Sequence, residues 1–365
     1  MNILVISNLT NNVDSGLNYS VPASVSAQAM IDNILWMDLT KNAFMEHWGK
    51  IASYHNVYDF GGSLLLDKLP DPFKRPDLVV FEGFYYLEHV LFSRQLTKRN
   101  IPYIIVPRCS LTSNAFRNGS WIKFLKKKIA HLLFFNRFVD KSLAIQYLTE
   151  QERIDSEEHF KHKSFIIPNG FDIPENKKES FSKGIKAVFI GRQDMFQKGL
   201  DILLYSIANV KDDLTEAGFH LDIYGPPRFD YKKVSSLIKS LGLDHLITNQ
   251  EKGVGGKQKE EVLLNSDLFV LTSRFEGHPM GLIEALSYGL PVLITRGANM
   301  YDEVNDTQSG FVCETDIDSV TSALKRVIAE RDKFGEYGEN ARELAKEYDW
   351  NRLAQKFHDY MIKLL

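Results

Sequence analysis

The stretch AVFIGRQDMFQKGLD, residues 187–201, decides the fold that this sequence predicts. Its first four residues are apolar and β-rich, a loop that begins with Gly191 follows, and a helical pattern starts at Leu200. An apolar run without strict alternation is typical of a strand buried on both faces of a parallel sheet. The stretch therefore predicts a strand, a loop and a helix in series, which is the repeating unit of an α/β fold.

The same unit recurs along the whole chain. Strands are expected at residues 3–6, 78–81, 103–106, 143–147 and 165–167, and in the second half at 187–190, 221–224, 268–271 and 291–294. Helices are expected at 200–210, 231–241, 317–331 and 338–348. Short apolar strands that alternate with longer helical patterns predict an α/β architecture with parallel sheets.

Length and turn chemistry predict two domains. A chain of 365 residues is longer than one ordinary hydrophobic core requires. The sequence IPNG at 167–170 has strong turn chemistry, and the polar stretch 175–183 that follows it is typical of a linker. We therefore expect a first domain over residues 1–167 and a second over 168–349, with 350–365 as a closing segment.

Composition places the chain among globular proteins of a reducing compartment. Apolar residues make up 44% and charged residues 25% of the sequence. The two cysteines, Cys109 and Cys313, form neither a disulfide framework nor a metal cluster. The first seven residues resemble a strand rather than a leader, and the longest apolar runs are too short to span a bilayer. We expect a cytoplasmic protein.

Positive charge is concentrated between residues 94 and 141. Eleven basic residues face a single acid, Asp140, in this region: Arg94, Lys98, Arg99, Arg108, Arg117, Lys123, Lys126, Lys127, Lys128, Arg137 and Lys141. Aromatic residues are interleaved with them: Trp121, Phe124, Phe134, Phe135 and Phe138. This combination suits contact with a membrane surface, on the inner face, or with a polyanionic acceptor. A solvated basic helix whose aromatic residues pack inward fits it equally well. No nucleic-acid partner is expected.

Ligands of open parallel sheets bind beyond the carboxyl ends of the strands, so chemistry is sought at strand-to-helix junctions. At the first such junction, Arg192 and Lys198 flank a loop between Gly191 and Gly199. Both cations can converge on one anionic group, and a diphosphate is the natural occupant. The alternative is that they are two solvated loop cations.

The second junction is the sequence EGHPMGLIE at 276–284. Pro279 suits the first position of a helix, so a helix is expected to begin between residues 279 and 281. Glu276 then lies in the loop and Glu284 in the first turns, where each carboxylate can accept hydrogen bonds from sugar hydroxyls. The alternatives are helix capping for Glu284 and loop packing for His278.

The third junction is the turn Tyr224-Gly225-Pro226-Pro227, beside the glycine-rich sequence GVGGK at 253–257. A Walker phosphate loop is excluded there because Glu251 and Gln258 stand at two of its required positions. The sequence contains no G-x-G-x-x-G motif, which weakens a dehydrogenase or epimerase interpretation.

These three junctions, in this order and spacing, resemble glycosyltransferase family 4, whose members have the GT-B fold of two Rossmann-like domains that face each other across a cleft. The resemblance implies that Arg192 and Lys198 hold the donor diphosphate, that Glu276 contacts the transferred sugar, and that Glu284 contacts the ribose. It also implies that the 350–365 helix crosses back to the first domain. The remaining donor contacts that it implies are Met280, Gly281 and Leu282 through backbone N–H groups, and Tyr224, Gly225, Pro226, Val254 and His278.

The first half resembles the family more weakly. Residues 14–19, which include Gly16 and Asn18, resemble the glycine-containing loop near the donor phosphates, with Gly16 on the donor side and Asn18 on the acceptor side. Arg108 and Cys109 stand where many members carry His-Gly. This departure leaves Arg108 either as an anion ligand on the acceptor side or as a structural residue.

The expected function is that of a retaining, hexosyltransferase-type enzyme. It would move a sugar from a nucleoside-diphosphate sugar to a saccharide or lipid-linked acceptor in surface polysaccharide synthesis. Arg192, Lys198 and Glu276 are the expected catalytic residues. No bound cofactor or metal is expected, because arginine and lysine can meet the charge of the leaving diphosphate. The alternatives are a non-catalytic nucleotide-sugar-binding subunit and a nucleotide-sugar epimerase.

Overall fold

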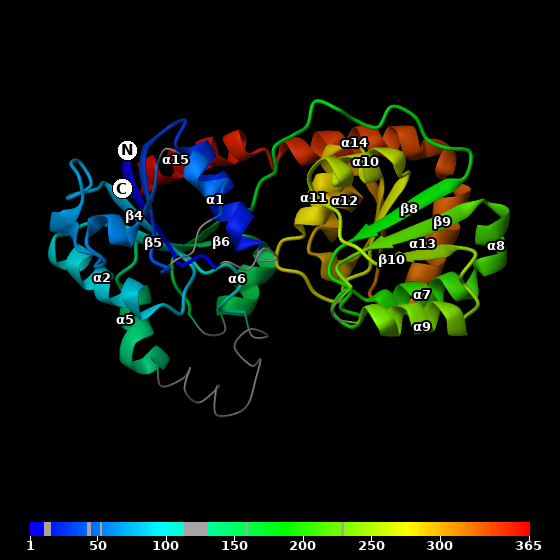
Figure 1. Cartoon of the computed structure of the whole chain (residues 1–365), viewed down its shortest axis with the longest axis horizontal. Coiled ribbons are helices and arrows are strands. Elements are labelled where there is room, and N and C mark those ends of the chain that lie inside the picture. Colours follow the sequence, from blue (N-terminus) through cyan, green and yellow to red (C-terminus); the bar gives the residue numbers. More distant parts are fainter. Residues whose placement is uncertain (11–15, 42–44, 52, 113–129, 158–159, 228–229) are drawn as a thin grey trace. The chain divides into compact units, whose positions relative to one another are not determined.

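The computed structural model describes all residues except 11–15, 42–44, 52, 113–129, 158–159 and 228–229 (Figure 1). The chain forms two compact units. Unit 1 comprises Met1–Gly170 together with Trp350–Leu365, and unit 2 comprises Phe171–Asp349. The division falls after residue 170, whereas 167 was expected. It stays a prediction that unit 1 binds the acceptor and that unit 2 binds the donor.

Unit 1 is built on a parallel sheet of seven strands in the order β3-β2-β1-β4-β5-β6-β7. The strands are β1 Asn2–Ser7, β2 Asn33–Asp38, β3 Tyr54–Asn56, β4 Leu78–Glu82, β5 Tyr103–Val106, β6 Ala144–Tyr147 and β7 Ser164–Ile166. The five strands expected in this half are confirmed. Strand β2 was missed although its apolar run, residues 34–37, is almost fully buried.

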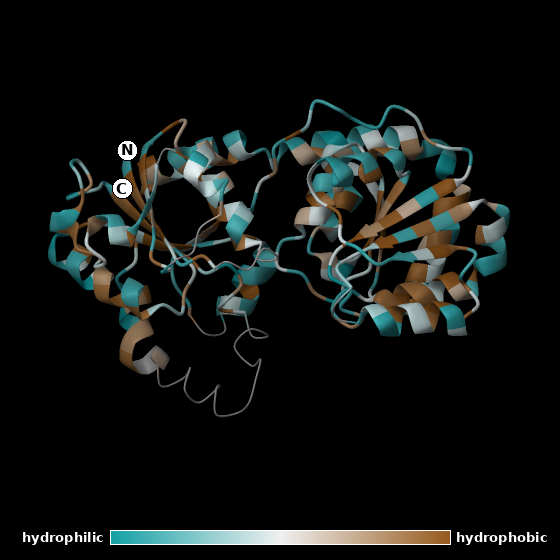
Figure 2. Ribbon diagram, in the orientation of Figure 1, coloured by the Kyte–Doolittle hydropathy of each residue, from teal (hydrophilic) through white to brown (hydrophobic). Residues whose placement is uncertain are grey.

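The helices of unit 1 cover both faces of this sheet. They are α1 Leu17–Gln28, α2 Leu87–Lys98, α5 Asn136–Asp140, α6 Glu150–Glu157 and α15 Trp350–Leu364, with a π-helical turn, η4, at His131–Phe135. Ile3 and Val5 of β1 face α1 and α15, whereas Leu4 and Ile6 face α2. This alternation follows from the period of two of a β-strand. Figure 2 shows hydrophobic residues gathered on the strands of both sheets.

Helix α15 packs beside α1 as an integral part of unit 1. Its buried residues are Trp350, Leu353, Ala354, Phe357 and Met361, at the spacing of one helix face. The Asp32 carboxylate, which follows α1, lies 2.9 and 3.0 Å from Nδ1 of His358 on α15 and 2.6 Å from the Met1 amino group. The end of the chain is thus fixed to its beginning by apolar packing and by one buried carboxylate.

The loop expected at residues 14–19 is helical from Leu17 onward. Helix α1 accommodates Pro22, which lacks the N–H that would otherwise bond to the Asn18 carbonyl. That carbonyl instead accepts a hydrogen bond of 2.9 Å from the Trp48 indole. A buried tryptophan therefore satisfies the acceptor that the proline leaves open. The expectations for Asp14 and Ser15 lie outside the described residues.

Unit 2 is built on a parallel sheet of six strands in the order β10-β9-β8-β11-β12-β13. The strands are β8 Ile185–Ile190, β9 Phe219–Tyr224, β10 Ile247–Gln250, β11 Leu268–Leu271, β12 Val292–Thr295 and β13 Gly310–Cys313. The helices are α7 Leu200–Asn209, α8 Lys211–Glu216, α9 Tyr231–Ser240, α10 Gly256–Asn265, α11 Met280–Ser287, α12 Tyr301–Thr307, α13 Ile317–Ala329 and α14 Phe334–Lys346. In Figure 1, α7 and α9 cover one face of this sheet, and α12 and α14 cover the other.

The strand order of unit 2 reverses between β8 and β11. From β8 the chain winds outward through β9 to β10, and from β11 it winds in the opposite direction to β13. Such a switch point opens a crevice beyond the carboxyl ends of the two central strands. The loops after Ile190, Tyr224, Gln250 and Leu271 therefore emerge at one edge of the sheet, which is where the sequence analysis placed the chemistry.

The polar stretch 175–183 is not a free linker but a part of unit 2. Lys178 Nζ lies 3.0 Å from Asp267 Oδ1, and both side chains are almost completely buried. Ser182 and Lys186 donate backbone hydrogen bonds to the same carboxylate. The segment is thus anchored to unit 2 by the buried Lys178–Asp267 pair, while most of its other polar residues are exposed.

We predict that Asp32→Asn destabilises the chain at pH 7 and that this loss becomes smaller as the pH falls below the unfolded pKa of aspartate. Burial opposes ionisation of Asp32, but hydrogen bonds from the Met1 amino group, His358 and Gln28 outweigh it and lower the pKa of Asp32. A lowered pKa stabilises the fold above the unfolded value of about 3.9 and loses that effect as the pH falls through the folded value. Urea unfolding between pH 7 and pH 3 measures the difference. The control is Asp359→Asn on the exposed side of α15, and an equal loss at both pH values would contradict the prediction.

Candidate functional site

An ion pair between Lys198 and Glu276 lies at the switch point of unit 2. Lys198 Nζ is 2.6 Å from Glu276 Oε1, and Ser273 Oγ donates to the same oxygen at 2.5 Å. Lys198 belongs to the loop after β8 and Glu276 to the loop after β11, the two central strands. The side chains are only 14% and 8% exposed, so the pair is largely withdrawn from solvent. Two of the three expected catalytic side chains are thus brought together.

The two loops touch through their backbones at Gly199 and Thr272. Thr272 Oγ1 donates to the carbonyl oxygens of Gly199 at 3.1 Å and of Lys198 at 3.3 Å. Gly199 has a φ of +61°, and a Cβ built on it would lie 1.9 Å from the Thr272 carbonyl oxygen. Only glycine fits this position, because any side chain would force the two loops apart.

Arg274, which the sequence analysis missed, fastens the same two loops a second time. Its guanidinium forms a bidentate pair with Asp201, at 2.7 Å for each bond, and donates to the Phe196 carbonyl at 2.8 Å. Its backbone N–H donates to the Gln197 carbonyl at 2.8 Å. The sequence contains no motif that predicts the role of Arg274, because an arginine next to a phenylalanine is not a distinctive local pattern.

Arg192, the third expected catalytic residue, lies on the same loop as Lys198. Its side chain is exposed, and its guanidinium donates to Gln197 Oε1 at 3.2 Å. Gln197 adjoins Lys198 in the sequence, so the two expected diphosphate ligands belong to one short loop. Arg192 is the more accessible of the two.

Glu284 is paired with a second lysine that the sequence analysis missed. Helix α11 begins at Met280, within the expected range, and Glu284 lies in its second turn, where its carboxylate forms an ion pair with Lys259 of α10. Pro279 occupies the N-cap rather than the first helical position, and no side chain caps this helix. The capping alternative for Glu284 is therefore wrong.

The start of α11 lies against the end of β8. A Cβ on Gly281 would stand 3.5 Å from the Ile190 carbonyl oxygen, just before the loop that bears Arg192. The N–H groups of Met280 and Leu282 donate to His278 and Pro279 within the turn, at 3.0 and 2.9 Å. That these N–H groups, with that of Gly281, serve a diphosphate stays a prediction.

The turn after β9 packs against both neighbouring loops. The Gly225 N–H donates to the Lys252 carbonyl at 3.1 Å, and a Cβ on Gly225 would lie 2.3 Å from the Gly191 carbonyl oxygen. A Cβ on Gly253, which precedes Val254, would lie 3.7 Å from Pro226. The three junctions singled out in the sequence thus lie side by side.

Asn299 supports the loop that bears Glu276 from behind. Its side-chain amide donates to the carbonyl oxygens of Glu276 and Gly277, the latter at 3.2 Å. Asn299 itself adopts a left-handed backbone with φ of 59°, which asparagine tolerates well. His278 packs within this loop, with its ring 5.7 Å from that of Tyr348. Burial raises the pKa of the Tyr224 hydroxyl at the neighbouring turn.

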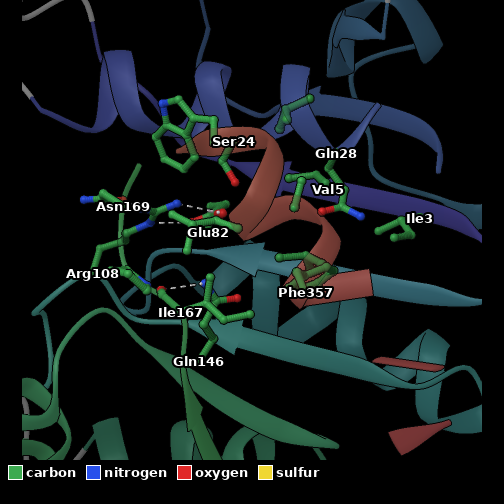
Figure 3. A pocket seen from close by; sticks show the side chains of 16 residues that line it. Ile3, Val5, Ser24, Gln28, Glu82, Arg108, Gln146, Ile167, Asn169 and Phe357 are labelled. Atoms are coloured by element: carbon green, nitrogen blue, oxygen red, sulfur yellow. Dashed lines mark hydrogen bonds and ion pairs between the residues drawn. The ribbon is translucent and has the colours of Figure 1, made fainter. Parts of the chain in front are cut away.

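In unit 1, the Arg108 side chain is buried and paired, as its structural alternative expects, and a role as an anion ligand stays a prediction. Its Nε lies 2.8 Å and its second amino nitrogen 3.1 Å from the two Glu82 oxygens, and its remaining nitrogen donates to Asn169 Oδ1. The side chains of the pair are 5% and 7% exposed. Figure 3 shows this cluster at the side of a cavity of about 40 Å³ that is also lined by Gln28 and Phe357. An anion would have to break this pair to reach Arg108.

The other expected residues of unit 1 are also engaged within the fold. Gly16 precedes α1, and its carbonyl accepts from Ser20 at 2.9 Å. Asn18 is fully buried, and its amide donates to the Thr10 carbonyl at 2.6 Å. The acceptor-side role expected of Asn18 stays a prediction, and in this structure its side chain serves the fold.

The described residues contain no cluster of three or more histidine, cysteine, aspartate or glutamate side chains suited to a metal. An Asp-x-Asp motif, a pair of carboxylates that can hold a metal, occurs once in the sequence as Asp316-Ile317-Asp318. Asp316 caps α13, because its carboxylate accepts from the backbone and hydroxyl of Ser319, both at 2.8 Å. The lack of a metal requirement stays a prediction.

Comparison with known proteins identifies the family. A doubly wound parallel sheet whose strand order reverses at a central switch point is the architecture of a Rossmann-like unit. Residues 170–344, nearly all of unit 2, match the model of the family described as glycosyl transferases group 1. The match assigns unit 2, and not the whole chain, to the group 1 glycosyl transferases.

Relatives and solved structures agree with this assignment. The chain is 24% identical to an uncharacterized glycosyltransferase of Methanocaldococcus jannaschii over 64% of each chain. It is 25% identical to the GtfA subunit of a UDP-N-acetylglucosamine–peptide N-acetylglucosaminyltransferase of Streptococcus parasanguinis, over 62% of this chain and 46% of that protein. The match thus spans less than two thirds of the length of either curated relative.

The fold of the whole chain is that of GT-B glycosyltransferases. It superimposes on HepE of Anabaena in complex with UDP with a TM-score of 0.75, at 16% identity and over 100% of both chains. The sucrose-phosphate synthase of Thermosynechococcus elongatus gives a TM-score of 0.72 at 16% identity, over 100% of this chain and 98% of that one. The expected GT-B fold of two Rossmann-like domains is confirmed.

We predict that Gly199→Ala destabilises unit 2 by about 2–5 kcal/mol, because the added Cβ meets the Thr272 carbonyl and the backbone is left-handed. Chemical unfolding followed by fluorescence measures this loss. The control is Gly335→Ala in α14, where a Cβ would meet no atom within 4 Å. That variant is expected to be neutral or slightly stabilising. Equal stability of the Gly199 variant and the native chain would contradict the contact between the loops.

Proposed function

We propose that this chain transfers a hexosyl group from a nucleoside-diphosphate sugar to a saccharide or lipid-linked acceptor in surface polysaccharide synthesis, with retention of anomeric configuration. The observation that carries the proposal is the Lys198–Glu276 pair, 2.6 Å apart at the switch point of a group 1 glycosyl transferase unit. UDP in the complex of a neighbour with the same fold supports a nucleotide-sugar donor.

The roles follow from the chemistry of the site. Lys198 and Arg192 would hold the diphosphate, and Glu276 would accept hydrogen bonds from the hydroxyls of the transferred sugar. Glu284 would accept from the ribose, held in place by Lys259. Contacts to the base and diphosphate would come from the backbone at residues 280–282 and from Tyr224, Gly225, Pro226, Val254 and His278.

The proposed reaction needs no protein nucleophile. The bond between the anomeric carbon and the phosphate oxygen breaks while the acceptor oxygen bonds to the same carbon from the same face. The acceptor proton passes to the departing phosphate oxygen, so the products are the glycoside and a nucleoside diphosphate. The protein contributes preorganised positive charge where negative charge develops, which is the electrostatic form of catalysis.

A phosphate of the donor can replace Glu276 as the ionic partner of Lys198. The Lys198 side chain is 14% exposed and its ammonium group is already held in place by the carboxylate, so little reorganisation of the lysine is required when the diphosphate enters. Glu276 would then be freed to accept from sugar hydroxyls. We further propose that the two cations suffice for the charge of the leaving group and that no metal is required.

The proposal includes the cellular location of the chain. It would act in the cytoplasm, with peripheral contact to the inner membrane face through the basic region 94–141. No described helix is both long and apolar enough to cross a bilayer.

We predict that Lys198→Ala lowers turnover by roughly 10²–10³, the range for loss of one preorganised donor in a transition state. Glu276→Gln should raise KM for the donor sugar and lower kcat while leaving the affinity for the free nucleotide nearly unchanged. Steady-state kinetics and calorimetry with the nucleoside diphosphate separate these effects. The control is Lys177→Ala, which removes an exposed lysine paired with Glu339 at 2.7 Å in the same unit. Native turnover of the Lys198 variant would overturn the assignment.

The decisive test is a transfer assay in the presence of a chelator. A thermal-shift panel of nucleotide sugars first identifies the donor, since a ligand bound by the native state raises apparent stability. We expect nucleoside diphosphate to be released only when an acceptor is added, and the product to keep the anomeric configuration of the donor, as read by NMR. Donor binding without release would favour the non-catalytic subunit. A changed sugar on an intact nucleotide would favour the epimerase, and an inverted product would refute retention.

A further inference from the structure

A cavity of about 570 Å³ lies in unit 1, away from the cavity of Figure 3, between α2 and the segment that runs from η4 into α5. Arg94 and Lys98 line it from α2, and Arg137 and Lys141 line it from the other side. Residues some forty positions apart in the sequence thus place four cations around one hollow. Its volume is within the range of small-molecule sites.

These four cations differ from the other described cations of the basic region 94–141, which are paired with carboxylates. Six of the eleven basic residues between 94 and 141 are described by the structure, and two of the six are neutralised within unit 1. Arg99 is paired with Asp67 at 2.7 Å and Arg108 with Glu82 at 2.8 Å. The other four all line the cavity, and no carboxylate is among its lining residues. The nearest acid in sequence, Asp140, is exposed on α5 outside the lining.

The hydroxyl groups of the cavity wall are already committed to the fold. Ser93 Oγ donates to the Val90 carbonyl at 2.8 Å, and Thr97 Oγ1 donates to the Ser93 carbonyl at 2.8 Å. The Tyr103 hydroxyl donates to the Phe138 carbonyl at 2.6 Å. Recognition in this cavity is therefore left to the guanidinium and ammonium groups, whose preferred ligand is a phosphate.

Two apolar side chains that line this cavity are exposed to solvent. Leu133 is 61% and Phe134 is 38% exposed, and both line the cavity. Their neighbours Phe135 and Phe138 are 5% and 1% exposed and pack into the core. Of the two interpretations of the basic region, inward packing holds for Phe135 and Phe138, whereas Phe134 joins the cations at the surface. Cations beside exposed apolar residues are the combination that binds the interface of an anionic bilayer.

We propose that this cavity binds the phosphate headgroup of an anionic phospholipid and docks unit 1 on an anionic membrane, with Leu133 and Phe134 against the acyl chains. The inference rests on the membrane contact of the proposed function and assigns it a site and a ligand. It does not depend on sugar transfer, because it concerns a surface of unit 1 and no residue of the proposed catalytic site. Docking at this surface places the enzyme where a lipid-linked acceptor is found.

The test is co-sedimentation of the full chain with vesicles. We expect binding to phosphatidylcholine vesicles that contain phosphatidylglycerol, no binding to phosphatidylcholine alone, and loss of binding at high salt. The double variant Arg94→Gln/Lys98→Gln should bind about 30-fold more weakly, from about 1 kcal/mol for each cation near an anionic surface. The control, Lys356→Gln/Lys363→Gln, removes the same charge from the exposed side of α15 and should bind like the native chain.

A second pair of variants tests the apolar contribution. Leu133→Ser should weaken vesicle binding, whereas Ile362→Ser, at an equally exposed position of α15, should not. If the cavity charge variant and its control weaken vesicle binding equally, the membrane is attracted by overall charge and not by a site. Unchanged binding of Arg94→Gln/Lys98→Gln and Leu133→Ser would overturn the proposal. Abolition of binding by millimolar free phosphate would show a soluble anion as the ligand instead. Thermal shift with the donor, which reports on unit 2, separates failure of this proposal from failure of the proposed function.

Discussion

The contact between Lys198 and Glu276 is the interaction on which the candidate site depends. Two loops from the central strands of unit 2 meet there, and the fold holds them together through Gly199, Thr272 and Arg274. Desolvating a lysine and a glutamate is costly unless they pair closely, and this pair is short and receives a third partner from Ser273. The proposed binding of a diphosphate depends on this largely buried positive charge at the switch point.

Unit 1 uses the same kind of interaction for a different purpose. At the corresponding end of its sheet, the buried Arg108–Glu82 pair reaches Asn169, just before the chain leaves the unit. Burial and bidentate geometry fit this arginine to hold the segment in place rather than to bind an anion. Four other described cations of the basic region 94–141, namely Arg94, Lys98, Arg137 and Lys141, line the cavity between α2 and α5 instead. Paired cations and cavity-lining cations are thus separated within one basic region.

Much of the fold was predictable, because buried parallel strands leave a strong local signal. All nine expected strands are present, and α7 begins at the expected Leu200. The misses have physical causes. Strand β3 is three residues long and half-buried, so its sequence signal is weak. Helix α1 contains Pro22, which cannot donate to the Asn18 carbonyl, and that carbonyl accepts instead from Trp48, thirty residues further along the chain. The polar stretch 175–183 resembled a linker because local composition cannot reveal that Asp267 is its partner.

The sequence by itself determined the class of the protein: its strands, its junction loops, and the lysine and glutamate side chains at them are local features, set by periodicity and turn chemistry. Only the tertiary structure decided which charges are used and how. Lys259, Arg274 and Asn299 acquire their partners from loops and helices that are distant in the sequence, and Arg108 is paired with Glu82 in the same way. Ionic pairing depends on the distance and burial of both groups, and neither quantity is fixed until the chain has folded.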